Sequence, residues 1–264
     1  MGVKERAKEL LNEVDGVLAC RQVGSSHVPH LFTAADIDDI SEEMPANERY
    51  PMAALARRLT AAEPGLKLAV VARGCDERAL LELGKQEQVE SSDVKIIGVA
   101  CDETLAKECG CETPYPTVVD SGAKVEAAGG GETGSLIEKL DAMSADDRLA
   151  YWLAQFGACI KCEGCRNICP MCYCKECALD NQELVGHGEV PPVEPVFHLI
   201  RAMDMAGRCI DCGLCEEACP MGIPLRSLYR KVGDLVEERF DYRPGRDAEE
   251  KSPLAILGTE EDLK

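Results

Sequence analysis

The spacing of apolar residues in the first part of the chain predicts short strands separated by helices. Residues 66–72 and 95–100 are nearly continuous apolar runs, which is typical of buried strands, and residues 16–20 form a third, shorter run. Helical spacing marks the segments 3–14, 33–43 and 51–62, and a further helix that runs through Leu83. The order strand, helix, strand between residues 66 and 100 predicts a right-handed βαβ unit with two parallel strands.

The second part of the chain has helical spacing without strand patterns. Apolar residues recur at helical spacing over 145–156, 196–206 and 225–240. A glycine triplet at 129–131 indicates a loop between the two parts, and the proline, glycine and charge after Tyr242 indicate an extended tail. We therefore expect an α/β domain with a short parallel sheet over 1–145, a mostly helical domain over 146–242 and a tail over 243–264.

The composition excludes several classes of protein. The 264 residues carry a formal net charge of −19, which argues against binding to nucleic acid or to an anionic membrane surface. No apolar run approaches the roughly 18 residues of a membrane span, and the charged N-terminal segment lacks the apolar core of a secretory signal. We therefore expect a cytoplasmic protein. In that reducing compartment its 16 cysteines indicate metal or redox chemistry rather than disulfides.

The cysteines of the second part form a repeated run. Cys159-x-x-Cys162-x-x-Cys165-x-x-x-Cys169-Pro170 recurs as Cys209-x-x-Cys212-x-x-Cys215-x-x-x-Cys219-Pro220. This spacing is that of bacterial ferredoxins, in which three closely spaced thiolates wrap one [4Fe–4S] cluster and the fourth ligates the other cluster. Pro170 and Pro220 fix φ and help to turn the chain away from the sulfurs.

The repeat predicts two [4Fe–4S] clusters with crossed ligation. One cluster is assigned to Cys159, Cys162, Cys165 and Cys219, and the other to Cys209, Cys212, Cys215 and Cys169. Because every iron then has a thiolate, the clusters suit electron transfer rather than Lewis-acid catalysis. The alternative is structural zinc in all-cysteine sites, although such sites usually consist of two separated Cys-x-x-Cys pairs. Trp152 and Phe156 precede the first run and are expected to shield it from water, and His198 is expected to be a packed or solvated histidine rather than a ligand.

The remaining cysteines form two further groups. Cys75 and Cys101 each follow a predicted parallel strand, and Cys109 and Cys111 lie on the segment after the second of these strands, so the four can converge on a third [4Fe–4S] cluster. Cys172, Cys174 and Cys177 directly follow the first run, where they either ligate another centre or form a reduced apolar patch. Spacing alone does not distribute these seven thiols and Cys20, the last residue of the apolar run at 16–20.

The turn between the first long strand and its helix is a weaker candidate site. Gly74 permits close backbone approach, and the helix N-terminus beside Arg73 and Asp76 could hold the phosphate of a flavin such as FAD. The alternative is an ordinary ion pair of Arg73 with Asp76 or Glu77.

Several segments resemble a known family. They are Cys165-Arg-Asn-Ile-Cys-Pro-Met-Cys-Tyr-Cys-Lys-Glu-Cys177, the stretches 197–202 and 206–224, and shorter stretches at 72–79 and 96–101. All are similar to proteins of the coenzyme F(420) hydrogenase/dehydrogenase beta-subunit type, and the spacing of the two runs also resembles helical ferredoxin modules of heterodisulfide reductase subunits. The resemblance implies a helical dicluster ferredoxin domain and an anaerobic host. It also implies partners among heterodisulfide reductase-like flavoprotein, formate dehydrogenase or hydrogenase subunits.

The function expected from the sequence is that of an iron–sulfur electron-transfer subunit of an anaerobic oxidoreductase, without a substrate site of its own. Two alternatives stay open at this point. One is a beta subunit that carries FAD and oxidises or reduces a deazaflavin, as the resemblance implies. The other is a zinc-stabilised scaffold without a redox role.

Overall fold

The computed structural model describes residues 2–42, 44, 48–181, 183 and 195–253. The chain divides into two compact units: residues 1–131 with 245–249, and residues 132–244 with 250–264. Residues 245–249 belong to the first unit because Gly245 N–H donates to the buried Glu82 carboxylate (3.0 Å) and Arg246 pairs with Glu112 (2.6 Å). Residues 254–264 of the predicted tail lie outside the described residues.

A four-stranded mixed sheet forms the centre of the first unit. Its strands are β1 (Gly16–Val23), β2 (Ser26–Phe32), β3 (Leu68–Ala72) and β4 (Val94–Gly98), in the order β2-β1-β3-β4. The pairs β1·β3 and β3·β4 are parallel, and β3, α3 (Gly74–Lys85) and β4 make the predicted βαβ unit. The sheet is not purely parallel as expected, because β2 pairs with β1 in an antiparallel hairpin.

The helix predicted over 33–43 is wrong. The hairpin strand β2 runs up to Phe32, and only a short 3₁₀ turn, η1 (Ile37–Asp39), follows it. The hairpin turns at Gly24, whose φ of 63° suits glycine. Pro29 hides the strand pattern, yet it is tolerated because β2 is an edge strand, where a missing N–H costs no ladder bond.

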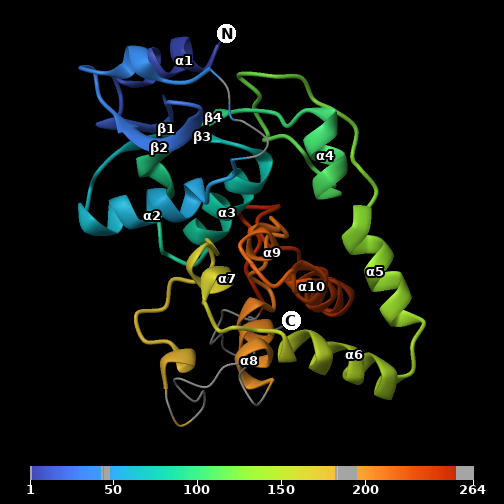
Figure 1. The fold of residues 1–264 in the computed structure, drawn as a ribbon. Coiled ribbons are helices and arrows are strands. Elements are labelled where there is room, and N and C mark those ends of the chain that lie inside the picture. The colour runs from blue at the N-terminus through green and yellow to red at the C-terminus, as the bar shows by residue number, and fades with distance from the viewer. Residues whose placement is uncertain (1, 43, 45–47, 182, 184–194, 254–264) are drawn as a thin grey trace. The chain divides into compact units, whose positions relative to one another are not determined.

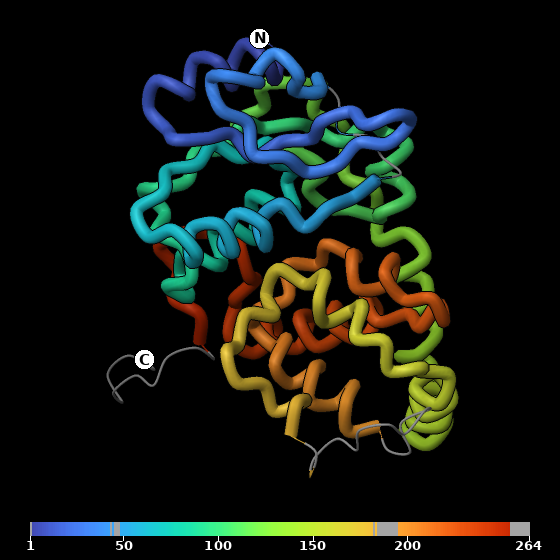
Figure 2. The backbone as a smooth tube through the Cα atoms, turned by 60° about the vertical axis from the view of Figure 1, so that its left-hand side comes forward, coloured from blue at the N-terminus to red at the C-terminus, as the bar shows by residue number. Residues whose placement is uncertain are grey.

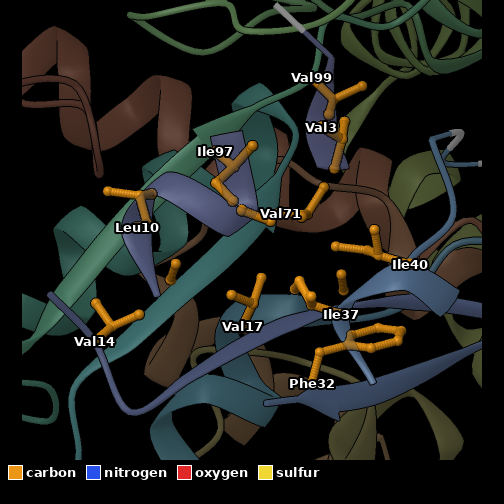
Figure 3. Packing of buried hydrophobic residues seen from close by; sticks show 13 residues of the cluster. Val3, Leu10, Val14, Val17, Phe32, Ile37, Ile40, Val71, Ile97 and Val99 are labelled. Atoms are coloured by element: carbon orange, nitrogen blue, oxygen red, sulfur yellow. The ribbon is translucent and has the colours of Figure 1, made fainter. Parts of the chain in front are cut away.

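Apolar side chains on one face of the sheet pack against α1 (Val3–Leu10). Val17, Val71 and Ile97 point from three strands toward this helix and are at most 2% exposed (Figure 3). The opposite face is covered by α2 (Met52–Ala62) and α3 (Figure 1). Burial on both faces explains why β1 and β3 appear as continuous apolar runs in the sequence.

Two further short elements of the first unit lie on either side of β4. They are η2 (Ser91–Asp93), which precedes β4, and α4 (Glu103–Cys109), which follows it. The side chain of Asp102 accepts a hydrogen bond from Leu105 N–H and caps the start of α4, and Gly110 ends it in the left-handed conformation with φ 54°.

The second unit is helical, as predicted. Its elements are α5 (Gly131–Asp141), α6 (Ala145–Gly157), α7 (Gly164–Asn167), η3 (Ala178–Asp180), α8 (Val196–Met205), α9 (Leu214–Glu217) and α10 (Leu225–Phe240). Three of them match the predicted segments 145–156, 196–206 and 225–240. Helices α8 and α10 pack together, and Arg201 of α8 donates to the hydroxyl of Tyr229 in α10 (3.1 Å). Within the described ranges, no helix has both the length and the apolarity to cross a membrane.

Candidate metal centre

The two cysteine runs fold into the same local structure. Lys161 and Asp211 occupy equivalent positions and have φ values of 54° and 55°, and Glu163 and Gly213 follow with 58° and 79°. The short helices α7 and α9 begin directly after these bends. In each loop two residues with positive φ, separated by one residue, are the local device that curls the chain.

The two loops lie against each other. Helices α7 and α9 are in contact, and the first run (yellow) lies beside the second (orange) in Figure 2. Gly164 approaches Ala218 so closely that a Cβ on Gly164 would lie 3.0 Å from the Ala218 carbonyl oxygen. This close approach brings the last cysteine of the second run, Cys219, toward the first three cysteines of the first run.

The first thiol group surrounds one pocket. Cys159, Cys162, Cys165 and Cys219 all line it, together with apolar residues that include Phe197, Pro220, Met221, Ile223 and Leu225. Burial raises the pKa of the Cys165 thiol to about 11, and the Arg201 charge opposes this while the other three thiols add to it. The predicted four cysteines are therefore neighbours in space.

The second thiol group is also assembled from both runs. Burial raises the pKa of the Cys215 thiol, and the charges of Cys212 and Cys209 add to this effect. The pKa of Cys169 is raised first by its hydrogen bond with Cys172 and then by burial, with a further contribution from Cys212. Cys169 of the first run thus lies beside the second run, which is the crossing that the spacing predicts.

His198 tests whether this pocket suits an iron–sulfur cluster. The imidazole is 1% exposed, lines the same pocket and stacks on Phe156 at 4.5 Å, yet neither ring nitrogen has a hydrogen-bond partner in the described part of the chain. Burial and the Arg201 charge lower its pKa to about 4, so the neutral ring keeps one N–H donor. An unsatisfied buried donor costs about 1–3 kcal/mol, and a cluster sulfur in the pocket would accept this hydrogen bond.

Arg201 gives a second indication of a negatively charged group. The guanidinium is 1% exposed and donates through Nε to Tyr229 and through Nη1 to the Cys172 sulfur at 3.5 Å, while Nη2 has no partner among the described residues. The pKa of Cys172 is lowered to about 6, mainly by the hydrogen bond with Cys169 and further by Arg201. A buried cation needs anions nearby, and thiolate-ligated clusters are anions, so the residues present fit the predicted group.

The other cysteines after the first run differ in their exposure to solvent. Cys172 is half-buried beside Cys169 and Arg201, whereas Cys174 is exposed. Cys177 immediately precedes η3, and its charge contributes to the raised pKa of Arg166.

The first unit brings its own cysteines together. Burial raises the pKa of Cys101 to about 12, and the neighbouring thiols of Cys75, Cys111 and Cys109 add to the effect. Cys20 does not join this group: it lies within β1 rather than after it, and it pairs with Pro29 of β2.

The turn suggested for a flavin phosphate is filled by the chain itself. Arg73 and Asp76 are 4% and 6% exposed, and the Asp76 carboxylate accepts a hydrogen bond from the Arg73 backbone N–H (3.1 Å). A Cβ on Gly74 would lie 2.5 Å from the Tyr115 carbonyl oxygen and 2.8 Å from that of Thr113. The close approach that Gly74 permits is therefore used by the chain's own carbonyls, and the flavin turn stays a prediction.

Across the ranges that the structure describes, no three Cys, His, Asp or Glu side chains converge as the ligands of one metal ion do. A cubane cluster differs from a single ion because its four thiolates bind four different irons.

Comparisons with known proteins give independent information about the chain. Residues 158–224 match the family model described as a 4Fe–4S dicluster domain. The chain is 39% identical over 99 residues to the F420-dependent formate dehydrogenase subunit beta of Methanocaldococcus jannaschii, covering 38% of this chain and 26% of that protein. It is 42% identical over 108 residues to the F420-dependent formate dehydrogenase 1 subunit beta of Methanococcus maripaludis, covering 41% of this chain and 27% of that protein.

A more distant similarity involves another multi-subunit enzyme. The chain is 29% identical over 111 residues to the acetyl-CoA decarbonylase/synthase complex subunit alpha 1 of Methanosarcina acetivorans, covering 41% of this chain and 12% of that protein. The aligned part is about a quarter of the length of the two formate dehydrogenase subunits. The matches confirm the predicted resemblance to F420-dependent dehydrogenase beta subunits, and the family model confirms the predicted 4Fe–4S dicluster domain over residues 158–224.

Proposed function

We propose that this protein is an electron-transfer subunit of an anaerobic oxidoreductase, and that it relays single electrons between partner subunits through two [4Fe–4S] clusters. The first cluster is held by Cys159, Cys162, Cys165 and Cys219, and the second by Cys209, Cys212, Cys215 and Cys169. Bound in this way, a [4Fe–4S] cluster supplies reversible one-electron chemistry.

The observation that carries the proposal is the crossed arrangement of the two runs. Cys219 lines the pocket of the first run, and Cys169 lies beside Cys172 and Cys212 at the second. In the proposed assignment, each run supplies three cysteines to one group and its fourth cysteine to the other group. Two sites that each receive a cysteine from both runs must be neighbours, and an electron relay requires neighbouring sites.

The surroundings of the two groups support a relay rather than a catalytic cluster. Four thiols are available for each cluster, so no iron is left for a substrate. His198 and Arg201 would donate to cluster sulfur or neutralise its charge, and such outer contacts set the reduction potential. Phe197 and Phe156 are 1% and 4% exposed and exclude water from this region.

The partners are proposed from the relatives. Two of these relatives are named as beta subunits of formate dehydrogenases and one as a subunit of an acetyl-CoA decarbonylase/synthase complex. We propose that this chain assembles with subunits of a formate dehydrogenase, a hydrogenase or a heterodisulfide reductase-like flavoprotein, in the cytoplasm of an anaerobe. FAD in this chain is the less favoured alternative, since the turn at Gly74 is filled by backbone carbonyls.

The test is a pair of cysteine variants purified without oxygen. Cys212→Ala should lose the iron and sulfide of about one cluster and stop electron passage to an acceptor, because one iron has no thiolate. Cys174→Ala is the matched control, since this thiol is exposed and lies outside both groups, and it should keep wild-type iron. Normal iron and electron transfer in Cys212→Ala, or zinc in place of iron in the wild type, would refute the proposal.

A further inference from the structure

Four cysteines of the first unit are placed together by the βαβ unit and the segment that follows it. The register of the parallel strands pairs Ala72 of β3 with Gly98 of β4. Cys75 comes three residues after Ala72 and Cys101 three residues after Gly98, so both follow the same edge of the sheet. Cys75 lies in the first turn of α3. This is the edge where open α/β sheets bind ligands.

The segment after α4 is fastened beside these two cysteines. Cys101 N–H donates to the Pro114 carbonyl oxygen at 2.8 Å. Arg78 of α3 donates through Nη1 to the Thr113 carbonyl oxygen at 3.1 Å and through Nη2 to the Cys111 sulfur at 3.8 Å. Cys111 N–H in turn donates to the Ala106 carbonyl oxygen inside α4. The same hydrogen bonds that fix the loop therefore bring Cys111 to the start of α3.

Two further contacts hold the loop in this position. Gly74 packs so tightly against the carbonyl oxygens of Thr113 and Tyr115 that no side chain would fit there. Glu77 accepts hydrogen bonds from the backbone N–H and the hydroxyl of Thr117, at 2.8 and 3.1 Å. The loop is thus anchored along the first turns of α3, and Gly74 has the role of permitting this approach.

Cys109 completes the group. It is the last residue of α4, and the left-handed turn at Gly110 joins it to Cys111, whose N–H returns to the same helix at Ala106. All four thiols are half-buried. They come from the start of α3, the segment between β4 and α4, the end of α4 and the loop after it.

Positive charge surrounds this group. Burial raises the pKa of the Cys75 thiol and the Asp76 charge adds to this, while the charges of Arg49, Arg78 and Arg73 oppose it. Arg73 is only 4% exposed, although its Nη2 donates to the Met44 carbonyl oxygen. Four thiolates around a metal centre are a concentrated negative charge, which these guanidinium groups would balance.

We propose that Cys75, Cys101, Cys109 and Cys111 hold a third [4Fe–4S] cluster in the first unit. The choice of iron–sulfur rather than zinc rests on the proposed function, because a centre that exchanges electrons must be redox-active and Zn²⁺ is not. The first unit thereby becomes a second electron-carrying part of the chain rather than a scaffold.

The experiment is iron, sulfide and zinc analysis of the full-length chain, reconstituted and handled without oxygen. Three clusters correspond to about twelve irons and twelve sulfides per chain. Cys101→Ser should lower both to about eight, and the EPR spectrum of the dithionite-reduced variant should lack one of the wild-type signals. Cys20→Ser is the matched control in the same unit and should keep about twelve irons.

The wild-type protein decides the question even if Cys101→Ser fails to fold. About eight irons with about one zinc per chain, or about eight irons and no zinc, would overturn the third cluster while leaving the proposed function intact. Failure of the proposed function has a different signature: iron content would then be unchanged in Cys212→Ala. Unchanged iron in a folded Cys101→Ser protein would also overturn the third cluster.

Discussion

Replacing Arg201 with methionine should lower the reduction potentials of the clusters in the second unit. Arg201 is fully buried, and its Nη1 lies 3.5 Å from the Cys172 sulfur. Cys172 in turn is hydrogen-bonded with Cys169, a proposed ligand of the second cluster. The Arg201→Met variant keeps the length and apolar stem of the side chain but removes the positive charge, which favours the cluster with the extra electron.

The size of the effect follows from Coulomb's law. The guanidinium contacts the Cys172 sulfur at 3.5 Å, and Cys172 is hydrogen-bonded with Cys169. If the second contact is as long as the first, the guanidinium lies about 7 Å from the Cys169 sulfur. At an effective dielectric constant of about 20, a unit charge at about 7 Å contributes about 2 kcal/mol. For one electron this corresponds to about 100 mV, since 59 mV is equivalent to a tenfold change in the equilibrium constant. Because relaxation of the surroundings screens part of it, we expect a decrease of about 50–100 mV.

The assay is a redox titration followed by EPR at low temperature. Arg201→Lys keeps the charge and should recover much of the lost potential. Lys231→Met removes an exposed charge that pairs with Asp141 at 2.7 Å, and it should shift the potentials little because water screens it. A potential in Arg201→Met equal to that of the wild type, with iron content unchanged, would refute the claim that Arg201 balances cluster charge.

Three further predictions test other parts of the structure. His198→Phe keeps the stacking on Phe156 but removes the ring N–H. The potential of the first cluster should then fall by about 40 mV, the equivalent of a hydrogen bond of about 1 kcal/mol. An unchanged potential in redox titration would argue against a hydrogen bond from His198 to cluster sulfur. Gly164→Ala places a Cβ 3.0 Å from the Ala218 carbonyl oxygen and should separate the two runs, so a chelator should remove iron from this variant more quickly. The control is Gly157→Ala, where a Cβ meets nothing within 4 Å. Equal rates of iron loss would contradict the close packing of the runs. Phe32→Ala removes a side chain that is 0% exposed and should lower the free energy of unfolding of the first unit by about 3–5 kcal/mol in denaturant unfolding. Val23→Ala, at a residue that is 55% exposed, should lower it by at most about 0.5 kcal/mol. Similar losses in both variants would contradict the described core.

The cysteine runs illustrate what spacing can establish. Three thiols separated by two residues each must lie on one tight loop, and a fourth thiol before proline is carried away from it. Spacing therefore predicts that Cys219 pairs with the first run and Cys169 with the second, and the position of Cys219 at the pocket of the first run supports the first of these pairings. Spacing does not establish which metal group is bound. The helices α6, α8 and α10 were equally predictable, because apolar residues that recur with the period of a helix over a long segment are typical of an amphipathic helix.

Other features depend on tertiary structure and could not be predicted in this way. Pro29 disguised β2, because its place on a sheet edge is decided by the neighbouring strands. His198 was expected to be an ordinary packed histidine, and it is packed, but its position at the pocket of the first thiol group is visible only in three dimensions. Arg201 was missed altogether, because the sequence does not show which group its side chain faces. An arginine inside an otherwise apolar helical face next to cysteine runs is the pattern that could have indicated it.

The most direct test of the central claim is EPR spectroscopy of the full-length protein, purified without oxygen and reduced with dithionite, with the Cys169→Ala and Cys219→Ala variants measured alongside. Because each run supplies a ligand to both clusters, the two clusters lie close enough for their spins to interact. The wild type should therefore show split or broadened signals of reduced [4Fe–4S] clusters. Each variant should lose the cluster of the opposite run and show the simpler spectrum of the one that remains. A colourless wild-type protein that contains zinc and gives no such signal would contradict the account.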